Sequence, residues 1–214
     1  MPLTILVTGF GPFPGAPFNP TGAIAERLAR LRRPGLSGFK IVTHVFPTSY
    51  AAVDRDLPSL VGRHKPRALL MFGLAARARH LRIETRARNA IALLPDVEGV
   101  SIGRSVIAAG HPPAIRLRTP LHPLLAALRR RCAVSASRDA GRYLCNYLCW
   151  RAAELAAAPG GPKLVAFIHV PPVSRGGPRK PSQVSSPRKP LPSIDNLVAA
   201  GERALVTIAA EARR

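Results

Sequence analysis

Short apolar runs alternate with segments of helical spacing along the whole chain. Runs of strand type cover residues 4–8, 39–45, 68–72 and 164–170. Helical spacing predicts helices over residues 21–31, with Thr21 as the cap, and over 50–64, 123–131, 144–155 and 193–213. Because strands and helices alternate, the pattern favours an α/β fold built from βαβ units.

The remaining segments are less regular. Residues 81–93 alternate only in part and predict an extended or hairpin segment, and residues 95–120 are loop-rich, with short strands expected near Val106. Residues 173–192 are rich in Pro, Ser and basic side chains, and such composition buries too little surface to offset ordering entropy, so a mobile loop is expected there. The length of 214 residues suits a single domain over 1–214.

The formal net charge of +21 raises the question of nucleic-acid binding, because phosphate neutralisation gives sequence-independent affinity. The arginines are scattered, however, and no zinc-finger, helix-turn-helix or aromatic RNA-binding pattern accompanies them. Aromatic residues make up only 5% of the chain, which is too few for a base-stacking platform. Specific nucleic-acid binding is therefore disfavoured, and weak, salt-sensitive adhesion to polyanions is expected instead.

The chain carries no sign of export or membrane insertion. Its first residues resemble an opening strand and lack the basic region of a signal peptide. No apolar run approaches the roughly 18 residues that a membrane span needs. Three cysteines, two of them four residues apart, make no disulfide framework. A cytoplasmic protein without membrane contact is predicted.

A nucleotide cofactor is not expected. The segment Gly9-Phe10-Gly11-Pro12-Phe13 follows a predicted strand, but Pro14 stands where the third glycine of a dinucleotide-binding fingerprint belongs. No phosphate-binding Gly-Lys-Ser/Thr sequence is found either, and no metal site is predicted.

Cys145 is a candidate nucleophile because it falls in the first turn of a predicted helix. The positive end of a helix favours a thiolate, and its free N–H groups can stabilise an oxyanion. Cys149 lies one turn further along, where this field has faded, and Cys132 follows three arginines that would lower its pKa. Position alone leaves these alternatives open.

His169 is the candidate base for this cysteine. His169 stands near the end of the predicted strand 164–170, and reactive groups gather at the carboxyl ends of strands. His44 lies in a similar strand-end context, so the residues alone do not separate the two histidines. An acid could hold the imidazole in the right tautomer, but the residues alone do not identify it, because Glu84 stands among Arg82, Arg86 and Arg88 and is simply interpreted as part of a surface charge pair.

Four sequence blocks together resemble the cysteine-type pyroglutamyl peptidases, also called pyrrolidone-carboxylate peptidases. They are Val7–Phe13 with Asn19-Pro20-Thr21, then Phe72–Ala75 through Glu84 to Asn89, then Ser137–Asn146, and finally Phe167–Pro171. The blocks occur in the family's order and span residues 4–171. The resemblance implies a peptidase that removes an N-terminal pyroglutamyl residue through a thioester intermediate, with Cys145, His169 and Glu84 as the catalytic residues.

The resemblance also implies the fold, the substrate pocket and the assembly. The expected fold is a three-layer α/β/α sandwich around a mixed, mostly parallel twisted sheet, and the expected assembly is a homodimer or homotetramer. Phe10 and Phe13 would flank the flat lactam ring of the substrate. The expected pocket is completed by Gly11, Asn19 and Leu74.

The chain departs from the family pattern at several places, one of which is the basic Pro-rich segment 173–192 after His169, expected close to the site entrance. Leu74 stands where Gln is common, and Thr85 stands where Arg is common. No arginine occupies the segment Ala92–Asp96, where the family places one that assists the oxyanion. Two alternatives follow: a related cysteine amidase or hydrolase that acts on a different small acyl group, and a catalytically weak binding protein for acidic partners.

Overall fold

The computed structural model describes residues 2–13, 15–174 and 191–214. Within them, the strands of the main sheet are β1 (Leu3–Phe10), β2 (Phe39–Phe46), β3 (Ala68–Leu74), β4 (Leu81–Glu84), β7 (Val134–Ser137) and β8 (Leu164–Val170), and β5 (Arg86–Arg88) pairs with β6 (Ala114–Arg116). The helices are α1 (Pro20–Ala29), α2 (Tyr50–His64), α3 (Leu121–Arg129), α4 (Leu144–Ala157) and α5 (Ile194–Ala212), with a short 3₁₀ helix η1 (Pro34–Leu36).

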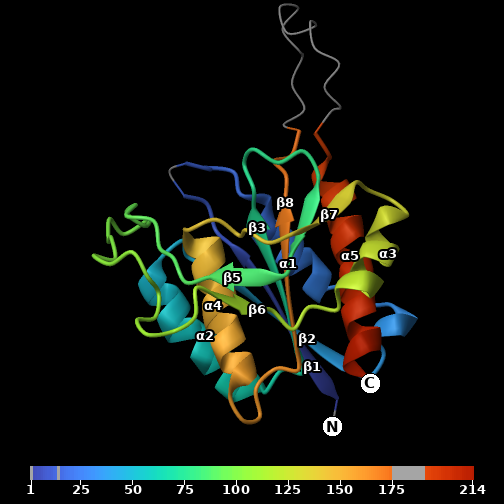
Figure 1. The fold of residues 1–214 in the computed structure, drawn as a ribbon. Helices are drawn as coiled ribbons and strands as arrows, with labels where there is room; N and C mark the ends of the chain where they lie inside the picture. Colours follow the sequence, from blue (N-terminus) through green and yellow to red (C-terminus); the bar gives the residue numbers. More distant parts are fainter. Residues whose placement is uncertain (1, 14, 175–190) are drawn as a thin grey trace, which may run out of the picture.

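The main sheet is mixed and mostly parallel, with strand order β2-β1-β3-β8-β4-β7. The first four strands run parallel, whereas β4 pairs antiparallel with β8 and parallel with β7. Helices α1, α3 and α5 cover one face, and α2 and α4 cover the other (Figure 1). Each face has its own buried apolar core, so the predicted three-layer α/β architecture is confirmed.

Most predicted elements are found, with small shifts at their ends. The helix predicted over 50–64 is α2, and the strands predicted over 4–8, 39–45, 68–72 and 164–170 lie within β1, β2, β3 and β8. The cap predicted for α1 was wrong. Asn19 is the N-cap, its side-chain oxygen accepting a hydrogen bond from the Thr21 amide at 3.1 Å. Thr21 is buried, and its hydroxyl instead accepts a hydrogen bond from the Phe10 amide at 2.9 Å.

The irregular regions differ more from expectation. β4 and β5 do not form a hairpin with each other, since β4 joins the main sheet and β5 pairs with β6. Val106 lies outside every described strand, and β7 was not predicted at all. The mobile loop expected over 173–192 falls largely on residues 175–190, outside the described residues, and the single domain stays a prediction. No helix in the described ranges is long and apolar enough to cross a membrane.

The loop from β1 to α1 is shaped by a close approach that only glycine permits. A β-carbon on Gly9 would lie 2.2 Å from the carbonyl oxygen of Thr21, well inside any tolerable contact. Residue 9 must therefore lack a side chain for the start of α1 to pack against the end of β1. This packing carries the chain from the sheet past Phe10 and Phe13 toward the carboxyl ends of β3 and β8.

Candidate active site

Three residues form a row across the middle of the sheet on the face covered by α4. In the strand register, Gly73 on β3 is the neighbour of His169 on β8, and His169 is the neighbour of Arg82 on β4. Glu84 lies two residues further along β4, opposite Phe167, so it is a diagonal neighbour of His169 on the same face. The antiparallel β4–β8 pairing thus places an acid beside an imidazole.

Glu84 and His169 are in direct contact in the interior. His169 Nδ1 lies 2.8 Å from Glu84 Oε1, and the side chains are 5% and 0% exposed, respectively. Burial would raise the pKa of Glu84, but the hydrogen bond to His169 and the charges of His169 and Arg82 hold that pKa below its ordinary value. Glu84 is therefore an anion at neutral pH, and it fixes the ring nitrogen to which it is bonded.

The imidazole of His169 is strongly basic for a buried histidine. Burial lowers its pKa, yet the interactions with Cys145 and Glu84 outweigh burial and raise the pKa to about 9. Arg82 adds a further contact to the acid, because its Nη2 lies 3.3 Å from Glu84 Oε1 and also donates to the Asp139 carbonyl at 2.8 Å. The guanidinium therefore joins the acid to the loop that precedes α4.

Cys145 is the second residue of α4 and therefore lies in its first turn, where the sequence predicted it. Tyr143 is the N-cap, and no side chain of the described residues caps this helix end. Gly141 has φ +84°, a left-handed conformation that favours glycine, and its amide donates to Asp139 Oδ1 at 3.0 Å. The first amides of α4 have no acceptor within the helix, so they remain free to bind an anion beside the sulfur.

Asn146, the next residue, anchors this helix start. Its side chain is fully buried; Oδ1 accepts from the Arg88 amide at 2.8 Å, and Nδ2 donates to the carbonyls of Arg88 at 2.8 Å and Ala90 at 3.0 Å. These three hydrogen bonds tie α4 to the end of β5 and to Ala90 just after it. The position of Cys145 is therefore fixed from both the sheet side and the loop side.

A cavity of about 170 Å³ opens directly onto the cysteine and the histidine. It is lined by Phe10, Phe13, Asn19, Thr48, Leu74, Ala140, Gly141, Arg142, Tyr143, Leu144, Cys145 and His169. Its walls are largely aromatic and aliphatic, with two neutral polar side chains and one guanidinium. Such a cavity suits a small, nearly neutral group with a few polar atoms.

The predicted pocket residues are brought together with one exception. Phe10, Phe13, Asn19 and Leu74 line the cavity, whereas Gly11 does not. The Gly11 amide donates to the Phe46 carbonyl at 2.9 Å, and its carbonyl accepts from Asn19 Nδ2 at 3.1 Å, so both of its backbone groups are already engaged.

The sequence interpretation missed several cavity residues. These are Thr48, Ala140, Gly141, Arg142, Tyr143 and Leu144. The last five precede Cys145 in the chain, and a nucleophile at a helix start necessarily brings its preceding loop to the substrate. Thr48 follows β2, and nothing in the sequence around it indicates a place in the cavity.

The competing cysteines and histidine lie elsewhere. Cys149 is fully buried, and burial raises its pKa well above the ordinary value. Burial also raises the pKa of Cys132, which is opposite to the effect expected from its neighbouring arginines. His44 lies on the edge strand β2, where its Nε2 is 3.3 Å from Asp56 Oδ2. None of the three lines the cavity.

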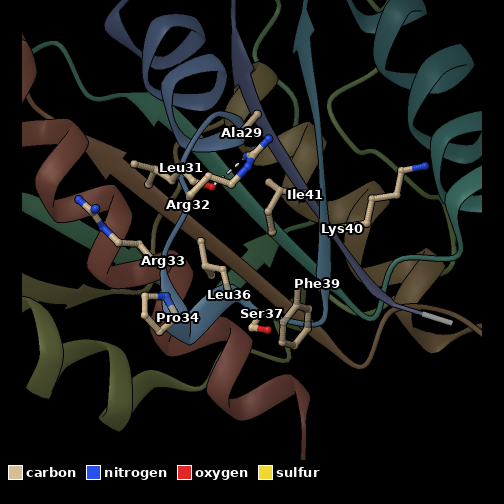
Figure 2. Close-up of a pocket in the computed structure, with 10 residues that line it drawn as sticks. All are labelled: Ala29, Leu31, Arg32, Arg33, Pro34, Leu36, Ser37, Phe39, Lys40 and Ile41. Carbon is tan, nitrogen blue, oxygen red and sulfur yellow. Dashed lines mark hydrogen bonds between the residues drawn. The ribbon is translucent and has the colours of Figure 1, made fainter.

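A larger hollow of about 600 Å³ lies around η1 and the start of β2 (Figure 2). It holds basic side chains but no cysteine or histidine. Arg33 pairs with Glu202, Arg32 donates to the Leu31 carbonyl, and Lys40 extends away from both in Figure 2. The charges do not converge, so this hollow has neither a cysteine–histidine pair nor a built anion site.

Comparison with known proteins agrees with the geometry. A family model described as pyroglutamyl peptidase matches residues 3–211. The chain belongs to the pyroglutamyl peptidase family. Among curated relatives, the pyrrolidone-carboxylate peptidase of Pyrococcus furiosus is 34% identical over 171 residues, covering 79% of this chain and 81% of that protein. That of Pseudomonas fluorescens is 28% identical over 205 residues, covering 95% and 91%.

Solved structures of the pyroglutamyl peptidase family share the whole fold. A mutant pyrrolidone carboxyl peptidase from Pyrococcus furiosus superposes with a TM-score of 0.82 at 30% identity, covering 98% of this chain and 99% of that one. Pyroglutamyl peptidase I of Bacillus amyloliquefaciens gives a TM-score of 0.81 at 26% identity, covering 97% of each chain.

Proposed function

We propose that this protein hydrolyses the bond after an N-terminal pyroglutamyl residue, with Cys145 as nucleophile, His169 as base and Glu84 as the orienting acid. Members of its family are cysteine-type hydrolases that remove N-terminal pyroglutamate. The observation that carries the proposal is the buried Glu84–His169 pair facing a cysteine at an uncapped helix start, beside an apolar cavity.

Proton transfer begins at His169. Its Nδ1 is bonded to Glu84, so Nε2 faces Cys145 and takes the thiol proton. The thiolate then attacks the pyroglutamyl carbonyl carbon, and the carbonyl oxygen becomes an oxyanion near the free amides of the first turn of α4. Loss of one such donor typically costs about 10²–10³ in rate.

The tetrahedral intermediate collapses when the carbon–nitrogen bond breaks. His169 gives its proton to the departing amine, which leaves a thioester on Cys145. A water molecule, deprotonated by His169, then attacks the thioester and releases free pyroglutamate and the thiol. Each proton that the imidazole accepts is returned in the same half-reaction, so the enzyme ends as it began.

The cavity accounts for selection of the acyl group. A pyroglutamyl ring is small, flat and uncharged, and Phe10 and Phe13 supply aromatic walls for it. An ordinary N-terminal residue would bring an ammonium group into this apolar space, at a desolvation cost that no carboxylate among the lining residues offsets. Leu74 contributes only apolar contact, so the polar atoms of the lactam must be bound by other groups of the cavity.

Release of aminomethylcoumarin from its pyroglutamyl amide, in reducing buffer, tests the proposal. Wild type is expected to be active, Cys145→Ala inactive, and Cys132→Ala active, because Cys132 lies outside the cavity. An inert wild type whose Cys145 is still alkylated preferentially by iodoacetamide would instead favour a hydrolase with a different small acyl substrate. Without activity or selective labelling, the enzyme hypothesis fails.

Compartment and assembly complete the proposal. We propose a reducing compartment, the cytoplasm, because the three cysteines are free thiols and one of them must stay reduced to act. A homodimer or homotetramer is also proposed, supported by the exposed side chains of Leu93, Leu94 and Val100, which are 68%, 57% and 50% accessible in the isolated chain. Sedimentation or light scattering measures the assembly.

A further inference from the structure

Arg142 lines the active-site cavity without a part in the proposed proton transfers. It lies between the left-handed Gly141 and the N-cap Tyr143, and its carbonyl accepts a hydrogen bond from the Ala92 amide at 2.5 Å. Its backbone is therefore fixed while its side chain is exposed. Within the described ranges the guanidinium has no hydrogen-bond or ion-pair partner, and residues 175–190 contain no Asp or Glu.

The exposure of the lining residues distinguishes the floor of the active-site cavity from its mouth. Phe10 and Leu144 are buried at 3% and 1% exposure, whereas Gly141 and Arg142 are exposed. A pyroglutamyl group must enter far enough for its carbonyl to meet the Cys145 sulfur. The remainder of the peptide then leaves through the mouth, past Arg142.

The surroundings of Arg142 leave its charge uncompensated. Asp139, the carboxylate three residues before it, pairs with Arg88 at 3.2 Å. The Asp139 carbonyl accepts a hydrogen bond from Arg82, so it is also engaged. The chain as a whole has a formal net charge of +21, so the field at the mouth attracts anions.

We propose that Arg142 is a specificity-determining residue that binds a carboxylate on the leaving side of the substrate, so that peptides with Asp or Glu directly after pyroglutamate are preferred. This inference rests on the proposed function. The neutral lactam offers the guanidinium no ionic partner, whereas the side chain of the next residue is displayed at the mouth. A guanidinium fork matches a carboxylate with two parallel hydrogen bonds.

Two C-terminally amidated peptides of nearly equal shape test the inference, pyroglutamyl-Glu-Ala and pyroglutamyl-Gln-Ala. Their kcat/KM values are measured in wild type, Arg142→Gln and Arg138→Gln at low salt and at 0.5 M NaCl. Arg138 is the matched control, since it is an exposed arginine of the same loop that does not line the cavity.

Wild type is expected to prefer the Glu peptide by roughly twofold to fivefold at low salt, the range of an exposed ion pair, and to lose most of this preference at high salt. Arg142→Gln should bring the ratio to about one, and Arg138→Gln should keep it. If wild type cleaves both peptides with a kcat/KM ratio of one, the inference about Arg142 is overturned but the proposed peptidase activity is supported. An equal loss on both peptides in Arg142→Gln also overturns it, because the residue would then act at the reacting carbonyl. If wild type cleaves neither peptide, both proposals fall.

Discussion

Gly73 lies directly beneath the sulfur of Cys145, and a β-carbon at position 73 would lie 2.8 Å from Cys145 Sγ. In the sheet, Gly73 is also the register neighbour of His169. β3 therefore has an open space beside the imidazole of His169, because residue 73 has no side chain to fill it. The sulfur fills this gap, so the glycine determines how closely α4 brings the cysteine to the sheet.

Gly73→Ala is expected to lower kcat/KM by at least about 10²-fold, since a 1 Å misplacement of a reacting group has an effect of that size. The new methyl would also meet the Phe167 ring at 2.5 Å, so some loss of stability accompanies it. Kinetics on the coumarin substrate and thermal unfolding measure both. Gly62→Ala is the control, because a β-carbon there meets nothing within 4 Å and should slightly stabilise α2. Full activity in Gly73→Ala would contradict the close approach.

Glu84→Gln removes the charge that faces His169 while keeping the size of the side chain. Since the glutamate raises the pKa of His169, its loss should lower that pKa and cost roughly 10²–10⁴ in kcat. The pH dependence of kcat/KM and an NMR titration of the imidazole report the two effects separately. A variant with near wild-type kcat would mean that Glu84 does not orient the base.

The pKa of His169, raised to about 9, predicts a stability that depends on pH. A raised pKa means that the folded state holds the proton more tightly than the unfolded chain, whose histidines titrate near pH 6.5. The stabilisation is therefore complete below about pH 6.5 and is lost as the pH rises through about 9. The difference in unfolding free energy between wild type and His169→Gln should shrink across that window. A difference independent of pH would show that the shift is absent.

Asn146→Ala should destabilise the protein by about 2–4 kcal/mol, because it leaves one amide and two carbonyls without their partner in a partly buried place. It should also reduce kcat, since the start of α4 loses its tie to the end of β5. Urea unfolding and the coumarin assay measure the two losses. Asn146→Asp keeps the acceptor for the Arg88 amide but lacks both donors, so its folded state should also be weakened. Wild-type stability in both variants would contradict the anchoring role.

The sequence predicted what depends on local pattern. Strand runs and helical spacing predicted the main strands and helices. A cysteine at a helix start could also be predicted, because the electrostatic field at the end of a helix depends on that helix alone. The histidine that accompanies Cys145 could not be predicted from local pattern. His169 and His44 occupy similar strand ends, and only the long-range antiparallel pairing of β4 with β8 places Glu84 beside His169 rather than beside His44.

Two other features were beyond local reasoning. The edge strand β7 has the sequence Val-Ser-Ala-Ser, whose small polar residues give no strong strand signal, and it is held by pairing with β4. Arg142 belongs to the block Ser137–Asn146, but local pattern assigns it no role, because its significance comes from the left-handed Gly141 before it and from the cavity that it lines. The family resemblance supplied the roles that pattern alone left open.

Under the proposed mechanism, the antiparallel pairing of β4 with β8 separates the residues that transfer protons from those that select the substrate. The proposed acid and base, Glu84 and His169, lie on neighbouring strands of one buried sheet, whereas the residues proposed to meet the substrate lie mostly on the loops after β1 and before α4. Changes in those loops can alter which peptides are accepted while proton transfer stays intact. A lineage with this architecture can therefore explore new substrates without first losing its reaction.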